Sequence, residues 1–110
     1  MKNESLSTET ELNDLLAADG PVWVLKHSNT CPVSTYAKQE FDAYVNDQDA
    51  TAGIVVVQEA RDLSNRIAER FDITHESPQA FLFVDGEVKW HASHGAILAD
   101  EMKHAAASFL

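Results

Sequence analysis

The sequence predicts an α/β fold in which a mixed sheet of four strands is flanked by helices. Two observations carry this prediction. Two largely apolar runs, residues 22–26 and 53–57, are separated by a helical pattern, which indicates parallel strands joined by a right-handed crossover helix. Further along, the pair Asp85-Gly86 stands between two more strand patterns and predicts a hairpin, and a last helical pattern follows it.

Helices are predicted where apolar residues recur at helical spacing between start and stop signals. A capping-box pattern at residues 8–11 begins the first helix, and Gly20-Pro21 ends it. The second helix is expected over residues 32–45, with a solvated connection at 46–49, and the third begins at residue 61 or 62. The predicted apolar faces of the four helices are Leu12, Leu15 and Leu16; Val33, Ala37, Phe41, Tyr44 and Val45; Leu63, Ile67 and Phe71; and Leu98, Met102, Ala105 and Phe109.

The two remaining strands are expected at residues 79–84 and 87–91, on either side of the hairpin turn. The predicted order is therefore α-β-α-β-α-β-β-α, which is the topology of the thioredoxin-like fold. The sequence has no repeat, low-complexity tract or linker, so residues 1–110 are expected to form one domain. Folds of this kind carry their chemistry beyond the carboxyl ends of the parallel strands.

Composition excludes several classes of function. The formal net charge is −10, from 18 acidic and 8 basic side chains, which argues against binding to nucleic acid or to an anionic membrane. No apolar run approaches the ~20 residues of a membrane span, and the first residues lack the apolar core of a signal peptide. One cysteine forms no internal disulfide. We therefore expect a cytoplasmic protein in a reducing compartment.

Cys31 is the only cysteine, and it lies where the first predicted strand gives way to the second helix. Because Pro32 is favoured at the first helical position, Cys31 is predicted to cap the helix, with the N–H groups of Val33 and Ser34 directed at its sulfur. Those donors and the helix dipole favour the thiolate over the thiol. The alternative is a small buried hydrophobic residue, but the proline and the helix start favour a reactive thiol.

Other candidate residues follow from the predicted topology. Thr30 and Pro32 flank the thiol, and Ser34 holds the position where a dithiol enzyme keeps its resolving cysteine. Ser77-Pro78 precedes the third predicted strand, which should begin at the edge of the sheet that carries the thiol. The histidines expected near this edge, as candidate thiolate or proton partners, are His27, His75, His91 and His94. Each of them is alternatively an ordinary loop or surface histidine.

Four segments carry a family resemblance. They are Lys26-His27-Ser28-Asn29-Thr30-Cys31-Pro32-Val33-Ser34; Val57-Gln58-Glu59-Ala60-Arg61 with Leu63-Ser64-Asn65; His75-Glu76-Ser77-Pro78-Gln79; and Gly86-Glu87-Val88-Lys89-Trp90-His91 with Ser93-His94. In these segments the chain resembles the YtxJ-type monothiol bacilliredoxins of the thioredoxin superfamily. The resemblance implies a thioredoxin-like fold, a cis bond before Pro78 and Cys31 as the redox nucleophile. Asp62 stands where this family is expected to have proline, at a helix start that bears no chemistry.

The resemblance also implies chemistry with a low-molecular-weight thiol, with bacillithiol as the expected co-substrate and no bound cofactor or metal. We expect a monomeric disulfide reductase that acts through Cys31 on S-thiolated client proteins. Two alternatives stay open from the residues alone. One is a non-catalytic binding or redox-sensing module of the same fold. The other is a metal or iron–sulfur carrier, for which a single thiolate is a poor start.

Overall fold

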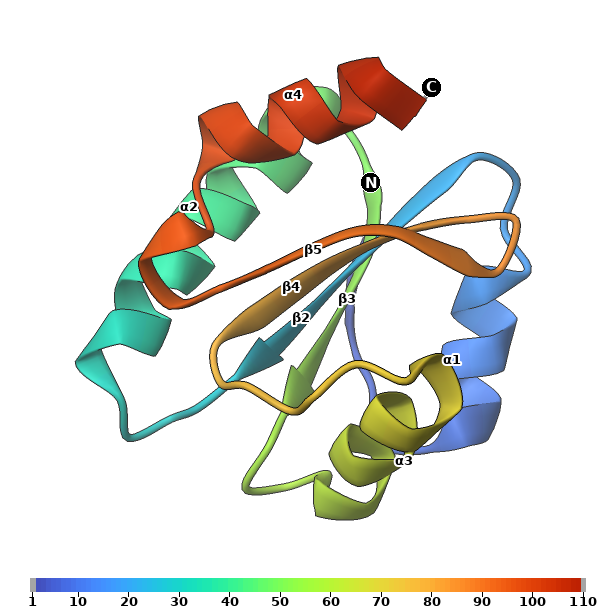
Figure 1. The fold of residues 1–110 in the computed structure, drawn as a ribbon, viewed down its shortest axis with the longest axis vertical. Coiled ribbons are helices and arrows are strands. Elements are labelled where there is room, and N and C mark those ends of the chain that lie inside the picture. Colours follow the sequence, from blue (N-terminus) through green and yellow to red (C-terminus); the bar gives the residue numbers. More distant parts are fainter. Residues whose placement is uncertain (1, 110) are drawn as a thin grey trace.

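The computed structural model describes residues 2–109 and the side chains of residues 4–109. Within these residues, five strands form one mixed sheet in the order β1-β3-β2-β4-β5, and four α-helices cover its faces (Figure 1). None of these helices has the length and apolar character that crossing a lipid bilayer would require. The elements are β1 Lys2–Ser5, α1 Glu9–Leu16, β2 Pro21–His27, α2 Pro32–Gln48, β3 Thr51–Val56, α3 Arg61–Phe71, β4 Gln79–Val84, β5 Glu87–Ser93, the 3-10 turn η1 His94–Ala96 and α4 Ala99–Phe109.

The α/β class and the mixed sheet are confirmed, but the prediction of four strands is wrong. The additional strand is β1, which pairs in parallel with β3 and forms one edge of the sheet. Its sequence, Lys-Asn-Glu-Ser, contains no β-branched or aromatic residue and therefore gives no strand signal. Backbone pairing with β3, rather than intrinsic propensity, defines this short edge strand.

Several element bounds also differ from the prediction. Helix α2 continues to Gln48, so most of the connection expected at residues 46–49 is helical. Asp49 is the C-cap residue, and its φ of 51° is left-handed. Strand β3 begins at Thr51 instead of residue 53. The hairpin at Asp85-Gly86 is confirmed, with φ angles of 54° and 79°, which a tight turn between antiparallel strands requires.

Two apolar clusters lie on opposite faces of the sheet. Helices α2 and α4 cover one face, where the Trp23 ring meets Tyr44 and Trp90 edge to face, with centroids 5.0 and 5.9 Å apart. Helices α1 and α3 cover the other face. Because side chains alternate along a strand, Trp23 and Leu25 of β2 join the first cluster and Val24 joins the second.

Three side chains that were assigned to apolar helix faces are exposed instead. Val33 is 42 % exposed, Leu98 43 % and Phe109 47 %. In the first turn of α2 the buried position belongs to Ser34, one residue after Val33. Leu98 lies before the first turn of α4, and Ile97 is the buried residue of that connection. Phe109 is the last residue of α4.

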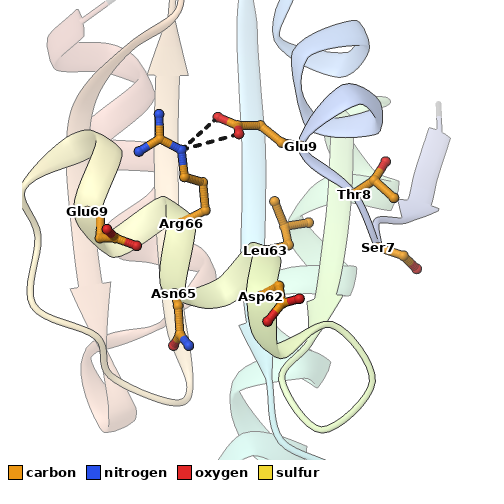
Figure 2. Close-up of a pocket in the computed structure, with 8 residues that line it drawn as sticks. All are labelled: Ser7, Thr8, Glu9, Asp62, Leu63, Asn65, Arg66 and Glu69. Atoms are coloured by element: carbon orange, nitrogen blue, oxygen red, sulfur yellow. Dashed lines mark hydrogen bonds and ion pairs between the residues drawn. The ribbon is translucent and has the colours of Figure 1, made fainter.

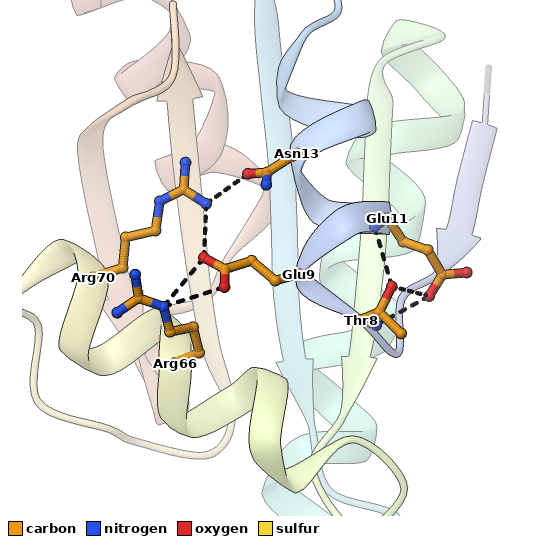
Figure 3. A network of polar contacts seen from close by, with 6 residues as sticks. All are labelled: Thr8, Glu9, Glu11, Asn13, Arg66 and Arg70. Atoms are coloured by element: carbon orange, nitrogen blue, oxygen red, sulfur yellow. Dashed lines mark hydrogen bonds and ion pairs between the residues drawn. The ribbon is translucent and has the colours of Figure 1, made fainter.

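The predicted capping box at the start of α1 is confirmed. The N–H of Glu11 donates to Thr8 Oγ1 at 3.2 Å, and the Glu11 carboxylate accepts from the N–H of Thr8 at 3.0 Å (Figure 3). Glu9, the first residue of α1, forms ion pairs with Arg66 and Arg70 of α3, each with a nitrogen–oxygen distance of 3.2 Å. These ion pairs connect α1 to α3, and both helices contribute residues to the same apolar cluster.

Gly53 in the middle of β3 lets α1 approach the sheet. A Cβ at this position would lie 2.7 Å from Leu6 Cδ1 and 2.8 Å from Leu15 Cδ2. Both distances are shorter than carbon–carbon van der Waals contact. A glycine therefore occupies a strand position that propensity alone would give to a larger residue.

We expect Gly53→Ala to lower the free energy of unfolding by about 1–2 kcal/mol, because the two leucine side chains must shift in a packed core. Urea denaturation checks this value. Gly95→Ala is a matched control, since a Cβ there meets no atom within 4 Å. Equal stability of both variants would contradict the close packing of α1 on β3.

The sheet places the loop after β2 and the loop before β4 at one edge. Strands β2 and β3 run parallel, and β4 runs antiparallel to β2 with Lys26 opposite Gln79. The chain therefore leaves β2 towards Cys31 at the edge where it enters β4 from Pro78 (Figure 1). This is the edge on which the candidate site is built.

Candidate active site

Cys31 is the N-cap residue of α2, as the sequence predicts. Its backbone is extended, with φ −108° and ψ 121°, and Pro32 occupies the first helical turn. The Cys31 carbonyl accepts from the N–H of Thr35 at 3.3 Å and so begins the hydrogen-bond ladder of the helix. The cysteine is half-buried and free. The sulfur therefore lies at the positive end of a helix of 17 residues and remains accessible.

Groups of the first helical turn lower the pKa of the Cys31 thiol. The N–H of Ser34 makes the largest contribution, followed among the favourable groups by the N–H of Val33 and the Ser34 hydroxyl; partial burial acts in the opposite direction. The predicted direction of the shift is borne out by this geometry. The predicted capping hydrogen bonds, however, do not form at full hydrogen-bond geometry. Sulfur is larger than oxygen and sits farther from Cβ, so it meets these donors less closely than a serine cap would.

Ser34 is fully buried, at 0 % exposure, in the first turn of the helix that Cys31 caps. Its oxygen accepts the N–H of Ser28 at 3.3 Å, which leaves the hydroxyl proton available to the sulfur. Ser34 therefore links the loop before Cys31 to the thiol itself. A polar side chain in the buried slot of an otherwise apolar helix face is explained by these two contacts.

Gln58, which follows β3, holds the loop that leads to Cys31. Its amide nitrogen donates to Ser28 Oγ at 2.8 Å and to Thr30 Oγ1 at 3.3 Å, and its amide oxygen accepts the N–H of Asn29 at 3.2 Å. Thr30, predicted as a site residue, therefore acts within this network of loop contacts. Gln58 itself was not predicted, because nothing in a linear sequence shows that a glutamine after one strand reaches the loop after its neighbour.

Gln58→Ala is expected to loosen the loop of residues 28–30, since one substitution removes three hydrogen bonds. Amide hydrogen exchange of this loop should accelerate by about tenfold, in line with the loss of roughly 1–1.5 kcal/mol of local stability. Mass-spectrometric exchange on the peptide that contains Asn29 measures the effect. The exposed Asn65→Ala is the control, and unchanged exchange in Gln58→Ala would show that the loop is held by other contacts.

Pro78 lies on the opposite side of the edge, and the bond between Ser77 and Pro78 is cis, as the family resemblance implies. The Pro78 carbonyl accepts the N–H of His94 at 3.0 Å, which joins this loop to the end of β5. Gln79, which is only 1 % exposed, stabilises the loop that precedes β4. Its side chain donates to the Thr74 carbonyl at 3.1 Å and accepts the N–H of Glu76 at 3.3 Å.

A buried lysine anchors the same loop from the α3 side of the sheet. Lys26 is fully buried; its Nζ donates to the Ser64 carbonyl at 2.9 Å and lies 3.1 Å from Nδ1 of His75. Burial lowers the pKa of Lys26 to about 8. Burial, followed by the charge of Lys26, also lowers the pKa of His75, so its ring is neutral and Nδ1 accepts a hydrogen bond at neutral pH.

The four candidate histidines lie near the edge, but no hydrogen bond or ion pair joins any of them to Cys31 in the described part of the chain. His75 serves the lysine anchor. His94 Nε2 lies 3.3 Å from a carboxylate oxygen of Glu76. The ring centroids of His91 and Phe81 are 6.4 Å apart. His27 ends β2, and burial, followed by the charge of Lys38, lowers its pKa. The arrangement therefore assigns no histidine as a direct partner of the sulfur.

Two buried polar atoms at this edge have no hydrogen-bond partner among residues 4–109: His27 Nδ1 and Ser77 Oγ. His27 is the last residue of β2, and Ser77 lies in the loop that leads into β4. Groups of this kind are rare in folded proteins. No group of three or more His, Cys, Asp or Glu side chains gathers to hold a metal within the same residues.

A groove of about 440 Å³ opens beside the sulfur, along the first turns of α2. Its lining residues are Asn29, Thr30, Cys31, Pro32, Thr35, Tyr36 and Gln39. A hollow of about 580 Å³ lies away from the site, between the start of α1 and α3 (Figure 2). It contains no cysteine or histidine, and its single arginine, Arg66, is bonded to Glu9. Only the first of these two cavities adjoins a reactive group.

Solved structures confirm the class that this fold and edge define, a thiol–disulfide oxidoreductase of the thioredoxin fold. One structure, provisionally described as an oxidoreductase with a thioredoxin fold, is 38 % identical, with a TM-score of 0.90 over 94 % of this chain and 92 % of its own. A thioredoxin variant from Halobacterium salinarum NRC-1 matches 98 % of this chain and 90 % of its own, with a TM-score of 0.80 and 20 % identity. Mitochondrial thioredoxin 3 from Saccharomyces cerevisiae matches 97 % and 95 %, with a TM-score of 0.76 and 15 % identity. The last two matches support the fold alone.

The chain belongs to the monothiol bacilliredoxin family. The family described as "Monothiol bacilliredoxin BrxC" matches residues 4–102, which include the cysteine, the cis proline and all five strands except the start of β1. A single cysteine agrees with the monothiol description. Thiols and proteins with reactive sulfur are accordingly the partners of this class.

Proposed function

We propose that the protein is a monothiol disulfide reductase that removes a low-molecular-weight thiol from protein mixed disulfides through Cys31. The observation that carries this proposal is the pairing of a helix-capping thiol with a buried serine, Ser34, in the position of a resolving cysteine. The capping position of Cys31 favours its attack on a disulfide. Because Ser34 is not a cysteine, release of the small thiol from Cys31 depends on another thiol from solution.

The reaction takes place in two exchanges. The Cys31 thiolate attacks the sulfur of the small thiol in the mixed disulfide; a new disulfide forms between them, and the client leaves as a thiolate. A second molecule of the small thiol, as its thiolate, then attacks this disulfide. It forms a symmetric small-molecule disulfide and returns Cys31 as a thiolate. Each exchange breaks one sulfur–sulfur bond and forms one, so the two electrons that reduce the client come from the small thiols.

The chain's own groups support these steps at defined atoms. The N–H groups of Ser34 and Val33 and the Ser34 hydroxyl stabilise the thiolate before attack and again after resolution. The loop that carries Pro78 borders the same edge, where an extended segment of the client can pair with exposed backbone. Thr30 and Pro32 complete the surface around the sulfur.

Bacillithiol is the co-substrate that we propose, on the strength of the family to which the chain belongs. The client proteins are those that carry this thiol in a mixed disulfide, and the reaction belongs in a reducing cytoplasm. We propose a monomer that needs no bound cofactor or metal. Its catalytic cycle requires only one active thiol and an external reductant.

Intact-mass spectrometry tests the proposal directly. The protein is incubated with a client that carries bacillithiol in a mixed disulfide, and with matched clients that carry glutathione, coenzyme A or cysteine. We expect Cys31 to gain the mass of bacillithiol while the client is reduced, and the Cys31→Ala variant to remain unmodified. The absence of an adduct from all four clients would refute the reductase function.

The pH dependence of alkylation separates a reductase from a passive binding or sensing module. Because the first turn of α2 lowers the pKa of the thiol, alkylation of Cys31 by iodoacetamide should reach half its maximal rate at a lower pH than in the unfolded chain. Measurements on the unfolded protein give the reference midpoint. Identical midpoints in the folded and unfolded protein would leave Cys31 without the activation that the proposal requires.

A further inference from the structure

The groove beside Cys31 contains more than the reaction of the sulfur requires. It extends from Cys31 across the outer face of α2 to Tyr36 and Gln39 and has a volume of about 440 Å³. Volumes of this size hold a small molecule, whereas a peptide client needs a longer surface. Because Cys31 is itself part of the wall, any group attached to its sulfur lies at the mouth of this groove.

The second observation is an aromatic ring held in water. Tyr36 is 70 % exposed, and tyrosine is a residue type that is enriched where proteins contact their partners. It lies in the groove wall five residues after Cys31, in the second turn of α2. Its ring packs in no aromatic pair among residues 4–109, in contrast to Tyr44 further along the helix, which packs on Trp23.

The third observation is the chemistry of the wall. The side chains around the ring are neutral hydrogen-bonding groups: Asn29, Thr30, Thr35 and Gln39. Of these, Thr30 is engaged by Gln58, whereas the side-chain amides of Asn29 and Gln39 make no hydrogen bond within the described residues. These amides can therefore bond to a ligand without breaking contacts of the protein. The wall contains no lysine, arginine or histidine, and the chain carries a net charge of −10.

We infer that this groove binds the non-sulfur part of the small thiol, by contact with the Tyr36 ring and by neutral hydrogen bonds to Asn29 and Gln39. The inference rests on the proposed function and adds its recognition site. It names the class of ligand: a thiol whose body presents hydroxyl or amide groups and a face that covers an aromatic ring. Carboxylate or phosphate groups of such a thiol find no cation in this wall and should face solvent.

Binding the small thiol in this place also decides which sulfur is attacked. When the body of the small thiol fills the groove, its sulfur lies next to Cys31 and the client sulfur points outward. Attack then joins the small thiol to Cys31 and releases the client as a thiolate. Attack on the other sulfur would join the client to Cys31 and release the small thiol. The groove therefore favours the exchange that reduces the client in one step.

The test compares two disulfides on one client protein: one with bacillithiol and one with 2-mercaptoethanol, which has almost no body to bind. The variants are Tyr36→Ala, Tyr36→Phe and Gln39→Ala, with Gln48→Ala at the far end of the same helix as the matched control. Steady-state KM and kcat are measured, and the first adduct on Cys31 is identified by intact mass. All three positions are exposed, so circular dichroism suffices to show that each variant is folded.

We expect Tyr36→Ala to raise KM for the bacillithiol disulfide by roughly five- to tenfold, with little change in kcat. The Phe variant should retain most of the affinity, because it keeps the ring, and Gln39→Ala should raise KM by roughly threefold. The 2-mercaptoethanol disulfide should respond to none of these changes. In Tyr36→Ala, the first adduct should shift from the small thiol towards the client, and added salt should leave KM of the unmodified protein nearly constant.

An unchanged KM in Tyr36→Ala, with adduct formation intact, would overturn the groove assignment and leave the reductase function standing. An equal rise in KM for both disulfides would also overturn it, because the groove would then bind the client. A complete lack of adducts in the unmodified protein is a different result, which refutes the reductase function itself.

Discussion

Replacing Ser34 with cysteine should convert the protein from a monothiol into a dithiol enzyme. Ser34 is fully buried in the first turn of the helix that Cys31 caps, and its hydroxyl helps to lower the pKa of the Cys31 thiol. In the Ser34→Cys variant, a second thiol stands in that place. It should displace the small thiol from Cys31 and close an internal disulfide.

The expected change is large because resolution becomes intramolecular. The adduct on Cys31 persists in the unmodified protein until an external thiol arrives, whereas in Ser34→Cys its lifetime should fall by about 10³-fold or more at millimolar thiol. Intact mass after a brief exposure to the disulfide distinguishes the outcomes: retention of the small thiol, or a protein that has lost two hydrogens and carries no adduct.

Ser34→Ala is the matched control for this experiment. It removes the hydroxyl that accepts the N–H of Ser28 and that lowers the pKa of Cys31, so the thiol pKa should rise, but the adduct should persist as in the unmodified protein. If the adduct on Ser34→Cys lived as long as that on Ser34→Ala, residue 34 would not reach the sulfur, and the explanation of the monothiol cycle would fail.

Replacing Lys26 with methionine should stabilise the protein at neutral pH and remove a pH dependence of stability. Lys26 is fully buried with no carboxylate bonded to it among the described residues, and its pKa falls from 10.5 to about 8. Below pH 8 the folded protein therefore holds a buried cation at a cost of about 3 kcal/mol. Hydrogen bonds to Ser64 and His75 offset part of this cost.

The sign of the pH effect follows from proton binding. Between pH 8 and 10.5 the unfolded chain keeps a proton on Lys26 that the folded protein has lost, so stability rises with pH over this range. The unmodified protein should therefore gain about 3 kcal/mol relative to Lys26→Met between pH 8 and 10.5. At pH 7 the variant should be the more stable by about 1–2 kcal/mol, once the lost hydrogen bonds are subtracted.

Urea denaturation of both proteins at pH 7, 9 and 10 measures this difference. Lys103→Met, at an exposed position of α4, controls for the loss of a positive charge from an acidic protein. Parallel stability curves for the unmodified protein and Lys26→Met would show that Lys26 titrates normally, and hence that the buried amine is solvated.

The fold was largely predictable because its signals are local. The apolar runs of β2 and β3, the Asp85-Gly86 turn and the Thr8 capping box each depend on neighbouring residues, and each is confirmed. Strand β1 was missed because its residues pair through the backbone alone. Val33 was misplaced because the helical spacing that includes it ignores the polar contacts that draw Ser34 inward.

The candidate site was predictable where chemistry and chain position coincide. Cys31 and Pro32 together predict a helix cap. Ser34, three residues after Cys31, stands in the position of a resolving cysteine. The contacts of Gln58, Gln79 and Lys26 could not be predicted, because each joins segments that are 28 to 49 residues apart or depends on which side chain is buried. Burial of a lysine, in particular, contradicts its ordinary preference for the surface.

The alternation of side chains along β2 separates the control of the two halves of the site. Leu25 belongs to the apolar cluster under α2, the helix that Cys31 caps, while its neighbour Lys26 holds the Pro78 loop from the opposite face through His75. The nucleophile and the loop beside it are thus anchored from opposite faces of the sheet. Substitutions on the two faces should act additively on the reaction, so selection can adjust thiol reactivity and client fit as independent traits.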